Sequence, residues 1–415
     1  MTKSFHVITL GCKLNKYESD CMANALMNNG YKLITDFEFA DIYIINTCAV
    51  TSESEKKSRQ YITKCLKLNP NAKIIVCGCA SQNNVDQFKN KPNVFSVFGN
   101  EGKENILDFI EMPVCEVVPF STNYSKIENP YITQTRAYLK VQDGCNNFCS
   151  YCLIPYLRGR TRSRALDECL NEGKQLAKTC KEIVLTGIDL SSYKPSLIEL
   201  IEGFSNIKCR VRLGSLEVNV INEDFLVRLS KIKNFCPHFH LSLQSGCDSV
   251  LKRMNRHYTT KEYFEKVQLI KKYFPFANIT TDVIVGFAGE SEQEFDYTKN
   301  FIEKVGFGGI HVFPYSKREG TVASKIYNDS VSNKTKTERV NVLKQIANNS
   351  FLNYLNQIKN ITFNVLTEDE ENGYIVGYSE NYIKFYLPIN TPKNMVVNVK
   401  INKPIYDGVL GEIIS

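Results

Sequence analysis

Three cysteines lie within eight residues of one another, in the segment Cys145-Asn-Asn-Phe-Cys149-Ser-Tyr-Cys152. The CxxxCxxC spacing lets three thiolates bind three irons of a cubane [4Fe–4S] cluster and leaves the fourth iron open to a substrate. A structural zinc site normally takes four ligands, commonly from two CxxC pairs, and no second pair or histidine is near in the sequence. The segment therefore predicts an iron–sulfur centre with one open coordination position.

Three further cysteines, Cys12, Cys48 and Cys79, each come just after a segment expected to form a strand. Taken singly, each would be interpreted as a small buried side chain. The carboxyl ends of parallel strands meet at one edge of a sheet, so the three thiols can come together and hold a second cluster with its own open iron. The other nine cysteines have no such pattern and are assigned to packing: Cys21, Cys65, Cys77, Cys115, Cys169, Cys180, Cys209, Cys236 and Cys247.

Residues 1–115 must position the second cysteine set. Apolar segments at residues 5–10, 41–46 and 73–76 are expected to be buried strands, and the expected helices between them are residues 18–28, 54–68 and 82–90. Strand–helix alternation at this spacing is typical of a parallel sheet with helices on both faces. The sequence predicts an α/β, flavodoxin-like N-terminal domain.

A second alternating region, residues 131–350, follows a proline-containing linker at residues 113–135. Six βα units predict an open, partial (βα)6 barrel rather than a closed eight-stranded one, and the cysteine triplet follows its first strand, at the face where barrel active sites lie. The expected strands are residues 137–142, 182–186, 210–213, 238–243, 281–285 and 309–313. The expected helices are residues 165–179, 197–204, 223–229, 261–273 and 292–305, with a connecting helix at residues 334–357.

The last segment, residues 352–415, changes to a period of two, which is typical of short strands. Its expected strands are residues 363–366, 374–378, 382–386 and 396–400, and they predict a small all-β module with OB-like proportions. Its charge gives no support for RNA binding, because five lysines stand against seven acidic residues. Its aromatic residues can either stack on bases or fill the core: Tyr374, Tyr378, Tyr382 and Phe385.

Composition excludes several classes of protein. The 415 residues carry a net charge of +7, 43% are hydrophobic, and no apolar segment is long enough to cross a bilayer. No secretory leader is recognised, so a cytoplasmic protein is expected and the 15 cysteines are not expected to form a disulfide framework. An iron–sulfur electron carrier has no use for a barrel and an RNA-binding tail, and a zinc-stabilised RNA-binding protein does not explain CxxxCxxC.

The triplet, with an aromatic residue before its last cysteine and its place after the first strand of a partial barrel, resembles the radical S-adenosylmethionine enzymes. The next segment, Leu-Ile-Pro-Tyr-Leu-Arg-Gly-Arg-Thr-Arg-Ser-Arg, is similar to the methylthiotransferase family, whose members convert an unreactive C–H bond into a methylthio group. The resemblance implies two [4Fe–4S] clusters, S-adenosylmethionine, an external electron donor and an unidentified sulfur donor. It implies cluster ligands at Cys145, Cys149, Cys152, Cys12, Cys48 and Cys79.

Segments after the barrel strands resemble the cofactor-contacting segments of that family. The implied S-adenosylmethionine contacts are Tyr151, Gly187, Ser215, Glu217, Gln244 and Val285. Glu217 would accept hydrogen bonds from ribose hydroxyls, and the alternative is that it pairs with a lysine or arginine. The C-terminal module resembles a TRAM domain, which presents RNA in several tRNA-modifying enzymes.

The segments Gly11-Cys-Lys-Leu-Asn-Lys-Tyr-Glu-Ser and Asn46-Thr-Cys-Ala-Val-Thr resemble the branch that acts on N6-threonylcarbamoyladenosine. The resemblance implies methylthio transfer to C2 of that base at position 37, in the anticodon stem-loop of tRNA. The alternatives are the isopentenyladenosine branch, which tends to carry Gln-Met after the first cysteine, and the branch for a ribosomal-protein aspartate, which tends to carry Pro-Lys.

A threonylcarbamoyl group carries a carboxylate and a hydroxyl, so its site should offer cationic or hydrogen-bonding partners. The basic residues beside the two cysteine sets are Lys13, Lys16, Arg158, Arg160, Arg162 and Arg164. If the arginine segment is extended, its guanidinium groups share one face suited to phosphate or carboxylate contact, and the alternative is a solvated run of charges.

Overall fold

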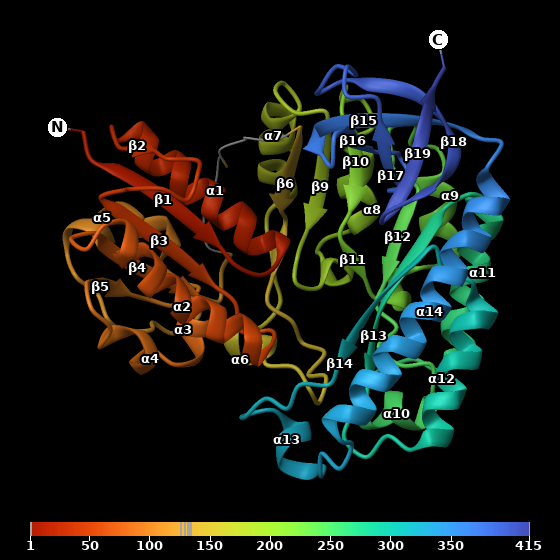
Figure 1. Ribbon diagram of the computed structural model, residues 1–415, viewed down its shortest axis with the longest axis horizontal. Helices are drawn as coiled ribbons and strands as arrows, with labels where there is room; N and C mark the ends of the chain where they lie inside the picture. The colour runs from red at the N-terminus through yellow and green to blue at the C-terminus, as the bar shows by residue number, and fades with distance from the viewer. Residues whose placement is uncertain (1, 125–126, 128–129, 131–134, 415) are drawn as a thin grey trace.

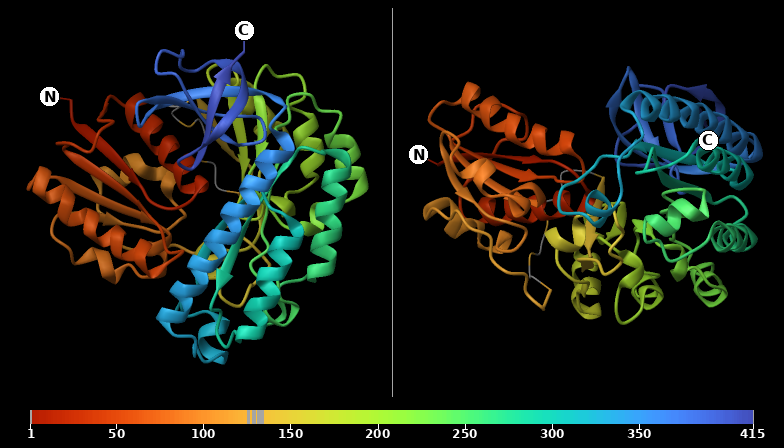
Figure 2. Two further views of the ribbon diagram at one scale, coloured as in Figure 1. Left: turned by 45° about the vertical axis from the view of Figure 1, so that its right-hand side comes forward. Right: turned by 90° about the horizontal axis from the view of Figure 1, so that it is seen from below.

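The computed structural model describes residues 2–124, 127, 130 and 135–414 and arranges them as three folded units (Figure 1). Parts of the expected linker and of the start of the barrel region, residues 125–126, 128–129 and 131–134, lie outside the described residues. The N-terminal unit lies beside the barrel, and the C-terminal unit covers one end of it (Figures 1 and 2). No helix among the described residues has the length and apolar character needed to cross a membrane.

The N-terminal unit contains a five-stranded parallel sheet in the order β2-β1-β3-β4-β5, which confirms the flavodoxin-like prediction. The three expected strands are β1 (Ser4–Thr9), β3 (Ile42–Thr47) and β4 (Lys73–Gly78). The sequence analysis missed two strands, β2 (Lys32–Leu33) and β5 (Val94–Val97), which form the edges of the sheet.

The helices of this unit differ from the prediction at their ends. α1 (Lys13–Asn28) begins five residues early, directly after Cys12, and α2 (Ser52–Leu68) begins where Thr51 Oγ1 accepts a hydrogen bond from the Ser54 N–H. The expected helix at residues 82–90 is two short helices, α3 (Cys79–Asn83) and α4 (Asp86–Lys89), and α5 (Ile106–Glu111) follows. The two cysteines Cys12 and Cys79 therefore stand at helix starts.

The barrel contains the six expected strands and one short strand that the sequence analysis missed, β11, in two parallel sheets, β10-β9-β6 and β11-β12-β13-β14. The open, partial barrel is thereby confirmed. The strands are β6 (Arg136–Lys140), β9 (Glu182–Thr186), β10 (Arg210–Leu213), β11 (Ser215–Leu216), β12 (His238–Leu241), β13 (Asn278–Val285) and β14 (Gly309–Pro314).

Helices cover the outer face of the barrel strands (Figure 1). They are α7 (Leu166–Leu176), α8 (Leu197–Glu202), α9 (Glu223–Leu229), α10 (Asp248–Arg253), α11 (Thr260–Tyr273) and α12 (Glu292–Val305). One large apolar cluster, which includes Leu139, Leu185 and Phe239, fills the space between the strands and these helices. Short elements at the carboxyl ends of the strands are β7 (Gln142–Asp143), α6 (Ile154–Leu157), β8 (Arg162–Ser163) and α13 (Val322–Ile326).

α14 (Asn333–Ile358) runs along the barrel to the C-terminal unit, which is a closed barrel in the order β15-β16-β17-β19-β18. The expected all-β module is confirmed, with one strand more than predicted. Its strands are β15 (Thr362–Glu371), β16 (Tyr374–Tyr378), β17 (Lys384–Leu387), β18 (Val396–Ile405) and β19 (Gly408–Ile413).

Arginines attach the C-terminal barrel to the amino ends of the larger barrel's strands. Arg212 donates to the carbonyls of Ser379 and Glu380 over 3.1 Å while it pairs with the buried Glu182 carboxylate at 2.9 Å. Burial raises the pKa of Glu182, but the arginines around it outweigh burial and hold that pKa well below its usual range.

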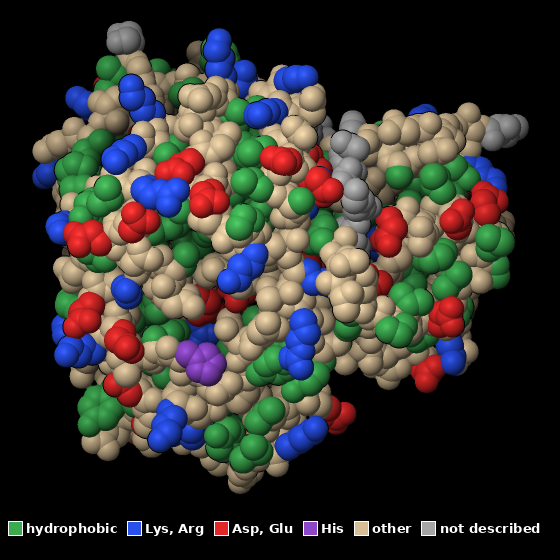
Figure 3. Space-filling view, turned by 180° about the vertical axis from the view of Figure 1, so that it is seen from behind, with side chains coloured by type: hydrophobic (Ala, Val, Ile, Leu, Met, Phe, Trp, Pro, Cys, Tyr) green, Lys and Arg blue, Asp and Glu red, His purple; other side chains and the backbone are tan. Residues whose placement is uncertain are grey.

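On the rear face of the molecule, acidic and basic side chains are interspersed (Figure 3).

Candidate functional site

The loop with the cysteine triplet leaves β7 and is held by the end of α10. The Ser150 N–H donates to the Met254 carbonyl at 2.9 Å, and Asn255 Nδ2 donates to the Phe148 carbonyl at 3.0 Å. Gly144 begins the loop at a φ of +71°, where a Cβ atom would lie 2.0 Å from the Arg160 carbonyl oxygen. Only glycine fits at that position, because both the backbone conformation and the space exclude a side chain.

The three thiols of this loop lie close to one another. Burial raises the pKa of Cys152 to about 12, with the neighbouring Cys149 and Cys145 thiols adding to it, and burial raises the pKa of Cys145 to about 11. Thiols this hard to ionise become good ligands when a metal centre supplies the compensating positive charge. The donor set therefore fits a cluster bound by three protein ligands.

The second cysteine set also comes together. Cys12, Cys48 and Cys79 follow β1, β3 and β4, which are neighbours in the sheet. Burial raises the pKa of Cys48 to about 11, and the Cys79 and Cys12 thiols contribute to the increase. Gly11, at a φ of +99°, allows this approach, because a Cβ atom there would lie 2.8 Å from Cys48 Sγ.

Cys77, the sequence neighbour of Cys79, lies on the opposite side of the sheet. It is fully buried in an apolar cluster with Phe5 and Tyr17. Cys77 lies within β4 and packs in that cluster, whereas Cys79 lies beyond the end of the strand, starts α3 and packs in a different apolar cluster. Its assignment to packing agrees with this position.

The expectation for the arginine segment is wrong for three of its four members, which are buried in ion pairs. Arg158 is fully buried and binds Glu18 Oε1 at 2.9 Å, Asp143 Oδ2 at 3.1 Å and Asn15 Oδ1 at 2.6 Å. Lys103 and Lys140 pair with the same Glu18 carboxylate. We call Glu18, Lys103, Lys140, Asp143 and Arg158 the buried charge network.

The other two buried arginines of the segment also form ion pairs. Arg162 pairs with Glu101 at 2.6 Å, and Arg164 pairs with Glu172 at 2.8 Å. Arg160, between Arg158 and Arg162, lies over the Phe148 ring at 4.2 Å and is exposed. The segment passes between two folded units, so its other three guanidinium groups meet carboxylates from other elements instead of solvent or ligand. Lys16 likewise forms an ion pair, with Asp20 on the next turn of α1.

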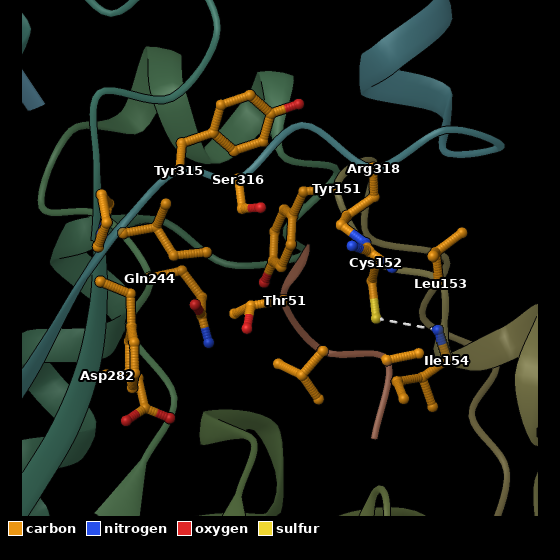
Figure 4. A pocket seen from close by; sticks show the side chains of 15 residues that line it. Thr51, Tyr151, Cys152, Leu153, Ile154, Gln244, Asp282, Tyr315, Ser316 and Arg318 are labelled. Carbon is orange, nitrogen blue, oxygen red and sulfur yellow. Dashed lines mark hydrogen bonds between the residues drawn. The ribbon is translucent and has the colours of Figure 1, made fainter. Parts of the chain in front are cut away.

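A cavity of about 300 Å³ is lined by Cys152 and by the residues that follow Cys48 (Figure 4). Its walls come from the residues after Cys48, from the residues around Cys152, and from the carboxyl ends of β13 and β14. The lining is mainly apolar, and Tyr151, Thr51 and Gln244 point toward one another inside it (Figure 4). An apolar cavity with a few convergent polar groups is typical of a cofactor site, and two of the expected cofactor contacts, Tyr151 and Gln244, line it.

The other expected cofactor contacts are dispersed. Gly187 and Ser215 line a larger neighbouring cavity, and Val285 is buried at the end of β13. Glu217 pairs with Arg256, whose Nη1 lies 3.2 Å from Cys149 Sγ, so the structure realises the ion-pair alternative for this carboxylate. Burial raises the pKa of Glu217, and Arg256 opposes that increase.

The larger cavity, of about 980 Å³, is bordered by all three folded units. Cys12 and Lys13 reach it from the N-terminal unit, and Tyr378 and Tyr382 reach it from the C-terminal barrel. The sequence analysis missed the residues that β12, β13 and β14 contribute, which include His240, Asp282 and His311. The signal available was the alternation in β12, His-Phe-His-Leu, which directs both histidines to the same face.

The aromatic residues of the C-terminal module pack within the protein. Phe385 is fully buried in the core of that barrel, and Tyr374 packs against Tyr386 with ring centroids 5.9 Å apart. Tyr382 stacks on Tyr378 at 4.8 Å and on His238 at 4.9 Å. These contacts favour the packing alternative over base stacking.

Two family models match the chain: Uncharacterized protein family UPF0004 at residues 4–99 and the Radical SAM superfamily at residues 139–302. Over 98% of this chain and 94% of the relative, the sequence is 38% identical to the threonylcarbamoyladenosine tRNA methylthiotransferase MtaB of Bacillus subtilis. The MtaB of Thermotoga maritima is 39% identical over 92% of this chain and 91% of its own. The tRNA-2-methylthio-N(6)-dimethylallyladenosine synthase of Thermodesulfovibrio yellowstonii is 32% identical over 100% and 99%.

Among solved structures, the radical S-adenosylmethionine methyltransferase TsrM from Kitasatospora setae, with cobalamin and a [4Fe–4S] cluster bound, has a similar fold. The TM-score is 0.56 over 78% of this chain and 74% of that one, at 11% identity. At that identity the likeness concerns the fold alone.

Proposed function

Because the chain belongs to the radical S-adenosylmethionine methylthiotransferase family, in the branch of its MtaB relatives, we propose that it adds a methylthio group to C2 of N6-threonylcarbamoyladenosine at position 37 of tRNA. The observation that carries the proposal is one cavity lined both by Cys152 of the barrel triplet and by Ala49, Val50 and Thr51, which directly follow Cys48 of the second set. Residues 1–115 would carry the auxiliary site, residues 131–350 the radical chemistry and residues 352–415 the contact with the tRNA anticodon stem-loop.

In this proposal Cys145, Cys149 and Cys152 hold one [4Fe–4S] cluster, and Cys12, Cys48 and Cys79 hold the second. When bound, the barrel cluster with S-adenosylmethionine supplies the radical that activates the C–H bond, and the second cluster supplies sulfur. A second S-adenosylmethionine molecule would supply the methyl group, and an external electron donor and a sulfur donor would complete the reaction.

The chain's own residues hold and shield the reacting groups. The mainly apolar walls of the smaller cavity, including Ile284 and Phe313, exclude water from the region between the cysteine sets. Tyr151 and Gln244 orient the nucleoside part of S-adenosylmethionine there, with Gly187, Ser215 and Val285 further along the strand ends. Arg256, bound to Glu217 and close to Cys149 Sγ, provides a fixed positive charge beside the barrel site.

The test uses anaerobically reconstituted enzyme and two anticodon stem-loops, one bearing N6-threonylcarbamoyladenosine and one bearing N6-isopentenyladenosine. Mass spectrometry of the nucleosides should show methylthio product from the first RNA, with discrimination on the order of 10⁴, because a polar site offered an apolar analogue is left with unpaired buried groups. The Cys149→Ala variant should form no product from either. Preferential conversion of the isopentenyl RNA would overturn the proposed substrate.

A further inference from the structure

The two lysines at the larger cavity differ in whether they form ion pairs with carboxylates. Two lysines line it. Lys384 binds Glu371 at 2.8 Å and Asp407 at 3.1 Å. Lys13 lies at the start of α1 beside Cys12, and within the described part of the chain no carboxylate forms an ion pair with it. Lys13 is half-buried, and a half-buried ammonium group without an anionic partner favours a ligand that supplies the anion.

The barrel strands contribute a complementary set of groups to the same cavity. His240 binds Asp282 Oδ2 through Nε2 at 3.1 Å and Thr280 Oγ1 through Nδ1 at 2.9 Å. The ligand atoms of His240, Asp282 and His311 lie within 4.8 Å of one another. Asp282 keeps 30% of its side-chain surface accessible, and among the described residues no hydrogen-bond partner is found for the His311 ring. This wall therefore offers both an acceptor and an imidazole to a ligand.

Lys13 lines the same cavity as the strand residues Asp282 and His311. Burial lowers the pKa of His311, and the neighbouring Asp282 carboxylate opposes the decrease. A ligand with a carboxylate at one end and hydrogen-bond donors at the other would satisfy the two sides at once.

We propose that this cavity is the specificity pocket for the threonylcarbamoyl group, with Lys13 binding its carboxylate and with His311 and Asp282 binding its hydroxyl and ureido N–H groups. The inference rests on the proposed function and assigns the residues that select its substrate. Cys12 lines the same cavity beside Lys13, so the pocket borders the auxiliary cysteine set. An isopentenyl group would enter the same pocket and leave Lys13 without an anion.

The test measures RNA binding rather than turnover. Reconstituted full-length enzyme is titrated with three anticodon stem-loops that carry threonylcarbamoyladenosine, isopentenyladenosine or unmodified adenosine at the same position. Wild type should bind the first RNA at least about tenfold more tightly than the unmodified one, which is the scale of one hydrogen-bonded charge. Lys13→Met should remove most of that preference, measured as the ratio of the affinities for the threonylcarbamoyl and the unmodified RNA.

Lys16→Met is the matched control, because Lys16 lies one turn further along α1, pairs with Asp20 and does not line the cavity. It should keep the wild-type preference. Each variant is compared with wild type for iron content, since Lys13 neighbours a cluster cysteine. If Lys13→Met loses iron, His311→Asn provides the same test from the other wall and should reduce the preference several-fold.

The outcomes separate the two proposals. Retention of the wild-type preference by an iron-replete Lys13→Met or by His311→Asn would overturn the assignment of the pocket. So would one zinc ion per chain that is present in wild type and lost in His311→Asn, because the imidazole would then be a metal ligand. Failure of wild type to convert the threonylcarbamoyl RNA would count against the proposed function, whatever the binding data show.

Discussion

The Glu18→Gln substitution tests whether the buried charge network fixes the N-terminal unit on the barrel. The network contains three cations, Lys103, Lys140 and Arg158, and two carboxylates, Glu18 and Asp143. Glu18 is 1% exposed and contacts all three cations. Glutamine has nearly the same shape but no charge, so the variant would leave three buried cations facing a single carboxylate.

Removing one partner of a buried ion pair costs about 3–5 kcal/mol, because the charges that remain are desolvated and uncompensated. We expect a loss of that size in the free energy of unfolding, measured by denaturant titration of the purified chain. The control is Glu202→Gln, whose partner Arg228 is about one-third exposed, and an exposed pair contributes at most about 1 kcal/mol. Equal, small losses in both variants would refute the reasoning.

The pH dependence of stability follows from the same carboxylate. Burial raises the pKa of Glu18, but the charges of Arg158, Lys103 and Lys140 outweigh burial and hold it well below its ordinary value of 4.5. A carboxylate with a depressed pKa in the folded state contributes stability that is present above about pH 4.5 and is lost as the pH falls further. Glu18→Gln should therefore lose less stability than wild type between pH 5 and about pH 3, and identical losses would contradict this.

Reconstituted wild type should contain about eight irons per chain, and Cys149→Ala should contain about half of them and fail to cleave S-adenosylmethionine; a wild-type content near four would exclude the auxiliary cluster. Cys48→Ala should still form 5′-deoxyadenosine under reducing conditions but no methylthio nucleoside, and methylthio product from a variant without the auxiliary cluster would refute the division of roles. Gly11→Ala should lose only the auxiliary irons. A side chain at this position is disfavoured by the positive φ and would lie too close to Cys48 Sγ, and we expect this strain to cost about 1–3 kcal/mol. Iron analysis checks this, and a wild-type iron content would contradict it.

Elements with a strong local pattern were predicted, and those fixed by distant contacts were not. The barrel strands and β1, β3 and β4 are apolar runs long enough to recognise. β19 contains two glycines and is held by pairing with β17 and β18, so its local sequence is a weak signal. α1 begins after Cys12, whose side chain makes no capping hydrogen bond, and the usual capping residues that announce a helix start are absent there.

The residues of the candidate site likewise separate into those that a local sequence pattern predicts and those that only distant contacts identify. The six cysteines were predicted as cluster ligands because each follows a strand or lies in a short recognisable spacing. Arg158 is buried in an ion pair with Glu18, which is 140 residues away in the chain. The spacing within the arginine segment therefore could not predict this ion pair. The pocket residues His240 and His311 come from different strands. They are recognised as parts of one site only when the strand order shows that β13 places Asp282 between them.

The buried charge network explains how two cysteine sets on separate units can keep one geometry. α1 starts at the Cys12 loop and carries Asn15 and Glu18, both bound to Arg158, which lies six residues after Cys152. On the other side, Asn100 Nδ2 lies 3.5 Å from Cys79 Sγ and 2.7 Å from the Leu157 carbonyl, and its Oδ1 accepts from Lys103.

An apolar interface of the same area would hold the two units together but would tolerate sliding, whereas directed ion pairs specify one register. The proposed reaction needs a radical from one site and sulfur from the other, so it would depend on that register, because displacement of either reacting group by about 1 Å is enough to slow a reaction on the order of a hundredfold. The network is buried and none of its members lines either cavity, so its position is better explained by alignment of the two sites than by binding of RNA phosphates.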